Sequence, residues 1–258
     1  MQGKVVFVGA GPGDPELITV KGLKTLQRAD LVVYAGSLVN RALLSELKAG
    51  AEAHDSAPLN LDEVLSLMAE GVAAGKRVVR LHTGDPSVYG AIQEQMEALD
   101  GLGISCEVVP GVTAAFAAAA SLKQELTLPG VSQTVVLTRI EGRTPVPEKE
   151  RLCRIAALGA TTCLYLSVDK LERVVEEFLA GGMFTAKTPA AVVSRASWED
   201  ERVVEGTLGD IAGKVAGAGI VRQALIIVGE VLSARTGGVP EKSKLYDPDF
   251  CHGFRIRT

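Results

Sequence analysis

Residues 4–13 of the chain read KVVFVGAGPG, and this stretch decides the class of fold. Its first half, residues 4–8, is a short valine-rich run that ends at a glycine, as is typical of a strand buried in a parallel sheet. Similar runs recur at 31–34, 77–81 and 105–109. Helical patterns lie between these runs, over 61–74 behind the cap residue Asn60 and over 91–102. The alternation predicts an α/β first domain with a mostly parallel sheet.

The second half of the chain repeats the alternation with a different connection. We expect strands at 133–138, 161–166, 190–194, 202–206 and 224–228, and helices near 147–158, 169–180 and 208–217. The seven residues between 190–194 and 202–206 are polar and suit a hairpin, so this domain should carry a mixed sheet. We therefore expect two α/β domains, 1–112 and 113–258, with the alanine-rich segment 111–121 as connector and 237–258 as an irregular tail.

Composition and charge exclude several classes of function. The 258 residues carry 27 basic and 31 acidic side chains, a formal charge of -4, which gives no long-range field for nucleic acid. The cysteines are far apart in sequence and the three histidines do not lie near them at ligand spacing, so no metal site is expected (Cys106, Cys153, Cys163, Cys251). No apolar run is long enough for a membrane span or a signal peptide, and we expect a cytoplasmic protein.

The glycine loop 9–15 lies where a dinucleotide-binding protein would carry its phosphate loop, but its chemistry differs. Pro12 and Pro15 remove N–H donors that a pyrophosphate needs, and Asp14 adds negative charge. The run ending at Tyr34 is followed by no acidic residue for a ribose hydroxyl. Such a turn can instead offer carbonyl oxygens to a cationic, amine-bearing ligand, or it can be a tight turn without a ligand.

Four ordered segments, taken together, resemble the tetrapyrrole methyltransferase family. They are VGAGPGD at 8–14, TGDPSVYG at 83–90, VPGVTAA at 109–115 and QALIIVG at 223–229. The resemblance covers essentially the whole chain. It implies two α/β domains, a homodimer, and S-adenosylmethionine bound in the cleft between the domains and leaving as S-adenosylhomocysteine.

The resemblance also implies which residues hold the cofactor. Residues from both halves of the chain would take part: Pro12, Thr83, Gly84, Asp85, Val88, Thr113, Ala114, Leu166, Ala196 and Ala224. Because a sulfonium is already an activated methyl donor, the protein mainly has to align the acceptor carbon with the methyl group. Asp85 can accept from the ribose or the ammonium group, or it can simply shape an Asp-Pro turn.

Other segments bear on the substrate. Family members that act on uroporphyrinogen usually carry Asp after the tyrosine of the second strand, where this chain has Ala35. The stretches at 35–39, 81–92 and 243–255 resemble instead the branch that methylates carbon 11 of precorrin-4, with or without cobalt, in cobalamin biosynthesis. The substrate carries many carboxylates, which need cations in an otherwise apolar trough. Candidate substrate contacts are Ser37, Arg41, His82, Tyr89, Arg139 and Arg143, with Arg255 and Arg257 weaker, and no residue is assigned as catalytic base.

The sequence leaves several alternatives open. Methylation at carbon 17 or 20 of the ring, or of a diphthamide precursor, would use the same family of folds. A nucleotide-dependent oxidoreductase and a tetrapyrrole carrier without a methyl donor are further possibilities. Each lone cation and histidine among the candidates can also be a solvated surface group or part of the packing.

Overall fold

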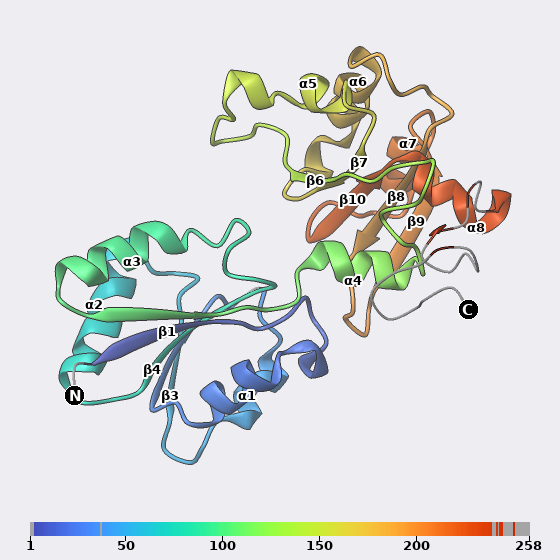
Figure 1. Ribbon diagram of the computed structural model, residues 1–258. Helices are drawn as coiled ribbons and strands as arrows, with labels where there is room; N and C mark the ends of the chain where they lie inside the picture. Colours follow the sequence, from blue (N-terminus) through green and yellow to red (C-terminus); the bar gives the residue numbers. More distant parts are fainter. Residues whose placement is uncertain (1–2, 37, 239–240, 242, 245–249, 251–258) are drawn as a thin grey trace. The chain divides into compact units, whose positions relative to one another are not determined.

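The computed structural model describes residues 3–36, 38–238, 241, 243–244 and 250 (Figure 1). The chain forms two compact units, each an α/β structure with a five-stranded sheet. The first unit is Met1–Ala117 with Ser197–Asp200, and the second is Ala118–Ala196 with Glu201–Thr258. The expected domain boundary between residues 112 and 113 stays a prediction, since compactness does not by itself define a folding unit. The expected fold class of two α/β sheets, one parallel and one mixed, is confirmed.

The first unit alternates strands and helices as the sequence predicts. Its elements are β1 (Lys4–Gly9), η1 (Pro15–Leu17), α1 (Val20–Gln27), β2 (Leu31–Tyr34), η2 (Arg41–Glu46), β3 (Glu52–Asp55), α2 (Leu61–Ala73), β4 (Val78–His82), α3 (Ile92–Gly101), β5 (Ser105–Val109) and the start of α4 (Ala114–Ser121). The strand order is β3-β2-β4-β1-β5, all parallel. Asn60 forms the expected helix cap, with a reciprocal bond to Glu63. The sequence analysis missed β3, whose residues EAHD are polar and half exposed because this strand lies at the edge of the sheet.

The alternating side chains of the first sheet build two cores. Val6 and Val8 of β1 face α1 and its residue Leu26. The neighbouring positions Val5 and Phe7 face α2 and α3 on the other side. Figure 1 shows this division, with α1 on one face of the sheet and α2 and α3 on the opposite face.

The order of the strands places a topological switch point at the carboxyl ends of β1 and β4, where open α/β sheets form a ligand crevice. These two strands are neighbours. The chain leaves β1 through α1 on one face, whereas it leaves β4 through α3 on the other face. In open α/β sheets, ligands bind where neighbouring strands send their connections to opposite faces. The loops that follow β1 and β4 therefore occupy the position in which a ligand site is expected.

The second unit contains a mixed sheet in the order β6-β7-β10-β8-β9. Its elements are β6 (Val135–Thr138), η3 (Glu148–Glu150), α5 (Leu152–Ala156), β7 (Thr161–Leu164), η4 (Val168–Lys170), α6 (Leu171–Ala180), β8 (Pro189–Ser194), β9 (Arg202–Thr207), α7 (Ile211–Gly217), β10 (Ala224–Val228), η5 (Glu230–Ser233) and α8 (Ala234–Gly237). The expected hairpin is confirmed, because β8 and β9 pair antiparallel from Pro189 opposite Thr207 to Ser194 opposite Arg202. The core of this unit packs helix residues such as Val174, Phe178 and Ile211 against the sheet.

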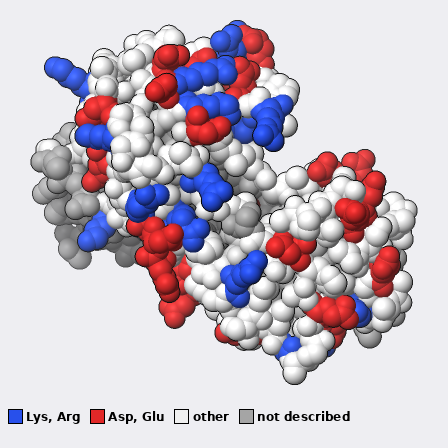
Figure 2. All heavy atoms as spheres, turned by 180° about the vertical axis from the view of Figure 1, so that it is seen from behind, with Lys and Arg blue, Asp and Glu red and all other residues white. Residues whose placement is uncertain are grey.

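Two further features bear on the kind of protein. Among the described residues, no helix is long and apolar enough to cross a membrane. On the face of the molecule drawn in Figure 2, acidic and basic side chains are interspersed. Most of the expected tail, 237–258, lies outside the described residues.

Candidate active site

Three loops of the first unit meet at the carboxyl ends of β1, β4 and β5, and glycines allow the contact. Gly11 and Gly84 exchange backbone hydrogen bonds of 2.8 and 3.2 Å, which join the first two loops. A Cβ atom added at Gly9 would lie 2.6 Å from the Cα atom of Gly111, and one at Gly111 would lie 2.1 Å from the carbonyl oxygen of Gly84. Only glycine fits such backbone approaches. The three predicted motifs, far apart in sequence, therefore form one structure.

Asp85 links the second loop to the third. One carboxylate oxygen accepts from the backbone N–H of Ser87 at 2.8 Å, and the other accepts from the N–H of Gly111, also at 2.8 Å. The first bond shapes the Asp-Pro turn that the sequence analysis considered, and the second ties this turn to the segment leading into α4. Both bonds are charge-assisted and among the stronger kinds of hydrogen bond. Direct contact of Asp85 with a cofactor stays a prediction, and its positioning of the loops is what the contacts establish.

The space above Gly84 is open, in contrast to its neighbours. A Cβ atom added there would meet nothing nearer than the Cα atom of Thr113, at 3.8 Å. Gly84 has a φ of 60°, which side-chain-bearing residues rarely adopt. A ligand can thus approach the backbone of Gly84 closely. Of the other predicted cofactor contacts in this unit, Thr113 is buried, whereas Thr83, Val88 and Ala114 are half-buried beside the same loops.

The loop around Pro12 differs from what its sequence suggests. Pro12 and Gly13 are buried, and their carbonyl oxygens already accept hydrogen bonds. The indole Nε1 of Trp198 donates to the oxygen of Pro12 at 3.0 Å, and the side-chain amide of Asn40 donates to that of Gly13 at 2.9 Å. The expectation that this turn offers exposed carbonyl groups to a cationic ligand is therefore wrong for these two groups. Trp198 lies against Gly13, where an added Cβ atom would come within 2.1 Å of the indole ring.

His82, the last residue of β4, is buried and stacks on Phe7 with ring centroids 5.9 Å apart. Burial, with a contribution from the charge of Arg80, lowers the pKa of His82 to about 3. Its imidazole is therefore neutral near pH 7, and its Nε2 atom has no hydrogen-bond partner among the described residues. Such a group does not exchange protons readily at neutral pH, and its ring packs against Phe7 at the end of β4. Its contact with a substrate remains a prediction.

Tyr89 projects from the turn that follows Asp85. It is 47% exposed and has a φ of 56°, and Ala91 two residues later also has a positive φ of 49°. Gly90 lies between them, and a Cβ atom there would come within 2.2 Å of the oxygen of Pro86. Strained backbone of this kind is concentrated at functional sites. The Tyr89 ring is thus exposed at a turn with unusual backbone conformation.

In the second unit, the predicted residues gather at one end of the sheet. Leu166 follows β7, Ala196 follows β8 and Ala224 begins β10, and the antiparallel pairing puts these three positions at the same end. Leu166 is 67% exposed, unusual for a leucine, and has a φ of 52°. Arg195 and Gln223 at the same end also have positive φ and bond to each other through backbone and side chains. Strain therefore marks this end of the sheet too.

The predicted substrate-binding cations differ in whether their side chains already have hydrogen-bond partners among the described residues. The guanidinium of Arg139 donates to the carbonyl oxygens of Thr144 and Pro145 at 3.0 and 2.8 Å, which closes its own loop. Arg41 and Arg143 are exposed, and neither side chain has a partner in the part of the chain that the structure describes. Arg41 and Arg143 are thus better suited to bind carboxylates than Arg139. Ser37, Arg255 and Arg257 lie outside the described residues.

Sequence reasoning missed Trp198, Asn40 and the fit of Gly9 against Gly111. Each depends on segments brought together only by folding, and a lone Trp198 in a hairpin loop carried no spacing signal. The described residues contain no group of three His, Cys, Asp or Glu side chains placed to hold a metal ion.

The two-unit α/β fold, with glycine loops at the carboxyl ends of a parallel sheet, is that of a methyltransferase family. A model of the Tetrapyrrole (Corrin/Porphyrin) Methylases matches residues 4–212, and the chain belongs to this family. It is 55% identical over 252 residues to the cobalt-precorrin-4 C(11)-methyltransferase of Methanocaldococcus jannaschii, covering 98% of this chain and 96% of the relative. It is 49% identical to the precorrin-4 C(11)-methyltransferase of Pseudomonas aeruginosa, over 97% of this chain and 98% of the relative.

Solved structures agree with these relatives. The X-ray structure of cobalt precorrin-4 methyltransferase CbiF, a cobalamin biosynthetic enzyme, matches with a TM-score of 0.87 and 49% identity, covering 89% of this chain and 95% of that one. A uroporphyrin-III C-methyltransferase from Thermus thermophilus, complexed with S-adenyl homocysteine, matches with a TM-score of 0.72 and 31% identity, over 89% and 93% of the two chains.

Proposed function

We propose that this chain transfers a methyl group from S-adenosylmethionine to carbon 11 of precorrin-4 or of its cobalt-bearing counterpart, in the synthesis of cobalamin. The observation that carries the proposal is that about half of the residues are identical, over nearly the full length, to those of relatives named for that activity. The same motifs form one structure at the switch point of the first sheet. The cofactor proposal is supported by the Thermus relative that binds S-adenyl homocysteine.

The residues of the first unit fit a ligand of this kind. The open approach to Gly84 and the small residues around it leave room for a ligand to lie against backbone. We propose that Thr83, Gly84 and Val88 contact the cofactor while Asp85 holds their loop against Gly111. When bound, S-adenosylmethionine would supply an activated methyl group on a sulfonium for the electron-rich ring carbon, with S-adenosylhomocysteine as the leaving group. The chain therefore has to position and desolvate the reactants, and it needs no nucleophile of its own.

The substrate proposal assigns a role to exposed cations. The unpartnered guanidinium groups of Arg41 and Arg143 are suited to pair with carboxylates of the ring. The exposed ring of Tyr89 is suited to pack against the macrocycle. For the second unit, we propose that Leu166, Ala196 and Ala224 present an apolar surface to the cofactor. His82 is poorly suited to act as a general base, because its pKa of about 3 makes it a weak base, and we assign no residue to that role.

Two further properties belong to the proposal. We propose a homodimer, as the family resemblance implies, and a cytoplasmic location. Sedimentation equilibrium of the purified chain tests the first, with twice the chain mass expected and a monomer at all concentrations contradicting it.

The activity is tested with purified protein, S-adenosylmethionine labelled on the methyl group, and precorrin-4 or cobalt-precorrin-4 as separate substrates. The expected product is heavier by one methyl group and carries the label. Calorimetry with S-adenosylhomocysteine tests the cofactor independently of turnover. Tight binding of a nicotinamide dinucleotide without binding of S-adenosylhomocysteine would instead favour an oxidoreductase, and absence of both would favour a carrier.

A further inference from the structure

A hollow lies on the first unit, away from the candidate active site. It encloses about 610 Å³, within the range of small-molecule sites. Lys4, at the start of β1, and Arg77, just before β4, line it. It therefore opens near the amino ends of the strands, whereas the candidate active site follows their carboxyl ends. Its floor includes Val6 and Val79, which are side chains of the sheet.

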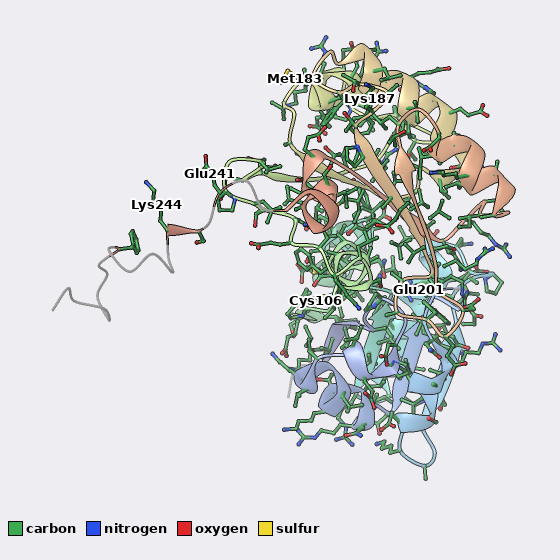
Figure 3. All side chains as sticks on the ribbon, turned by 90° about the vertical axis from the view of Figure 1, so that its right-hand side faces the viewer. Cys106, Met183, Lys187, Glu201, Glu241 and Lys244 are labelled. Carbon is green, nitrogen blue, oxygen red and sulfur yellow. The ribbon has the colours of Figure 1, made fainter. Side chains whose placement is uncertain are left out.

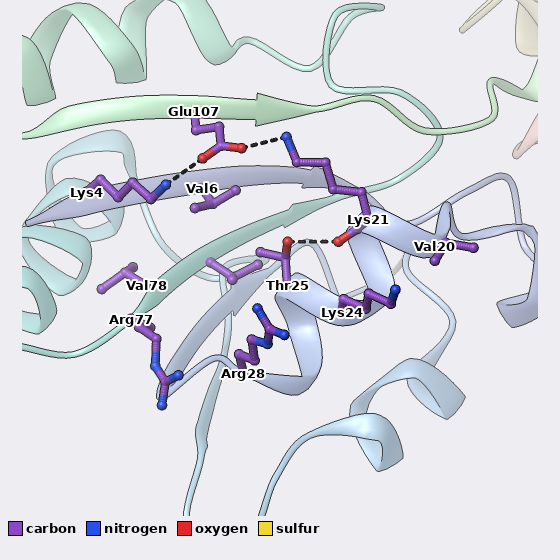
Figure 4. Close-up of a pocket in the computed structure, with 11 residues that line it drawn as sticks. Lys4, Val6, Val20, Lys21, Lys24, Thr25, Arg28, Arg77, Val78 and Glu107 are labelled. Atoms are coloured by element: carbon purple, nitrogen blue, oxygen red, sulfur yellow. Dashed lines mark hydrogen bonds and ion pairs between the residues drawn. The ribbon is translucent and has the colours of Figure 1, made fainter.

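Basic side chains line this hollow on two sides, as Figure 4 shows. Lys21 and Lys24 extend from α1 and Arg28 directly follows it, whereas Lys4 begins β1 and Arg77 directly precedes β4. The spacing of three and four residues places Lys21, Lys24 and the cap residue Arg28 on one face of the helix. Like charges four residues apart repel one another, and an anion bound between Lys24 and Arg28 would relieve that repulsion.

The one carboxylate that lines the hollow is already neutralised. Glu107 pairs with Lys4 at 2.6 Å and with Lys21 at 2.7 Å, and these two ammonium groups lower the pKa of Glu107 to about 2. Arg77 bonds through Nε to Asp30 at 3.1 Å. Lys24 and Arg28 have no ion-pair or hydrogen-bond partner for their side chains within the described ranges. Two unpaired cations thus remain beside an apolar floor.

We propose that this hollow binds a small organic anion that carries at least two carboxylates on an apolar body. The hollowed shape favours a small molecule over a flat protein interface, and the exposed apolar surface of Val20 gives no advantage to a purely polar anion such as inorganic phosphate. Lys24 and Arg28 each take one carboxylate, and the apolar body covers Val20, which is 69% exposed. The inference does not depend on the proposed methyl transfer, because none of these residues belongs to the candidate active site.

The test measures binding of naphthalene-2,6-dicarboxylate, a planar apolar dicarboxylate that is not a tetrapyrrole, and of citrate, a tricarboxylate without apolar surface. Fluorescence titrations compare the wild-type chain with Lys24→Ala/Arg28→Ala. The matched control is Lys187→Ala/Arg222→Ala, which removes the same charge from exposed side chains of the second unit that have no described side-chain partner. Figure 3 shows Lys187 in that unit. Thermal unfolding of each variant verifies that the fold is intact.

The wild-type chain and the control should bind naphthalene-2,6-dicarboxylate alike. Lys24→Ala/Arg28→Ala should weaken this binding by about fivefold to tenfold, and added salt should reduce the difference, because both cations are exposed. Citrate should bind more weakly than the naphthalene dicarboxylate. Equal binding of this probe by the two double variants would overturn the proposal, as would citrate binding at least as tight as that of the naphthalene dicarboxylate. Methyl transfer is assayed separately. A lack of methyl transfer would therefore not change the conclusion drawn from the binding measurements.

Discussion

The carboxylate of Asp85 offers the sharpest single perturbation of the candidate active site. It accepts two backbone N–H groups at 2.8 Å, and one of these bonds joins the loop of Gly84 to Gly111. Hydrogen bonds to a charged group contribute about 1.5–3 kcal/mol each to stability. In Asp85→Ala, the exposed N–H of Ser87 regains water, whereas the half-buried N–H of Gly111 loses its partner. We expect the free energy of unfolding to fall by about 2–3 kcal/mol.

The same change should reach the proposed cofactor. Gly84 is held on one side by Gly11 and on the other through Asp85, so the loop loses one of its two attachments. A loss of about 1.4 kcal/mol in binding free energy makes S-adenosylhomocysteine bind about tenfold more weakly. Calorimetry with S-adenosylhomocysteine measures this directly. Asp85→Asn is the matched control of equal size, because one amide oxygen can keep only one of the two bonds, and it should fall between wild type and Asp85→Ala.

The reasoning would be refuted if Asp85→Ala bound S-adenosylhomocysteine as tightly as wild type while unfolding at a lower denaturant concentration. Asp85 would then stabilise the unit without positioning the site. Equal binding losses in Asp85→Asn and Asp85→Ala would also contradict the account, since they would indicate that the negative charge itself contacts the ligand.

Arg143→Ala should raise the KM for the tetrapyrrole about tenfold, with little change in kcat or in S-adenosylhomocysteine binding. Arg139→Ala should mainly loosen its own loop and increase the cleavage of that loop by protease. A larger effect of Arg139→Ala than of Arg143→Ala on KM would reverse this assignment. Burial lowers the pKa of His82 to about 3, so the unfolded chain takes up the proton first as pH falls below about 6.5. The free energy of unfolding should therefore drop by about 2 kcal/mol between pH 7 and pH 5. Urea titrations of His82→Phe should lack this part of the drop. An identical dependence of unfolding free energy on pH in His82→Phe and wild type would exclude His82 as its source. Gly111→Ala places a Cβ atom 2.1 Å from a carbonyl oxygen and should abolish S-adenosylhomocysteine binding. Gly213→Ala, in α7 with no neighbour within 4 Å, should instead raise thermal stability slightly.

The elements of the fold followed from local patterns of the sequence. The valine run of β4 predicts a strand, and the apolar spacing of α2 after the cap residue Asn60 predicts a helix. Each prediction needs only neighbouring residues. The polar strand β3 was missed because its edge position requires no apolar pattern. Only the structure gives the strand order, and with it the switch point between β1 and β4. The residues of a strand do not reveal which other strand pairs with it.

The candidate site shows the same division. The resemblance identified the loops of Gly11 and Gly84, yet their hydrogen-bonded contact depends on the pairing of distant strands. From its sequence, the Pro12 turn can offer carbonyl oxygens to a ligand or be a tight turn without one, because the sequence does not reveal that Trp198 donates to Pro12 and Asn40 to Gly13. A substrate contact of His82 stays a prediction, and the structure adds that its ring stacks on Phe7, which the sequence does not reveal.

The central claim is methylation at carbon 11, and the position of the new carbon tests it most directly. Purified protein is incubated with cobalt-precorrin-4, or with precorrin-4, and S-adenosylmethionine carrying a ¹³C methyl group, and the product is examined by ¹³C NMR. The account predicts one enriched methyl resonance, correlated with carbon 11 of the ring. Enrichment at carbon 17 or carbon 20 would contradict it, as would an unlabelled ring recovered with both substrates while S-adenosylhomocysteine still binds.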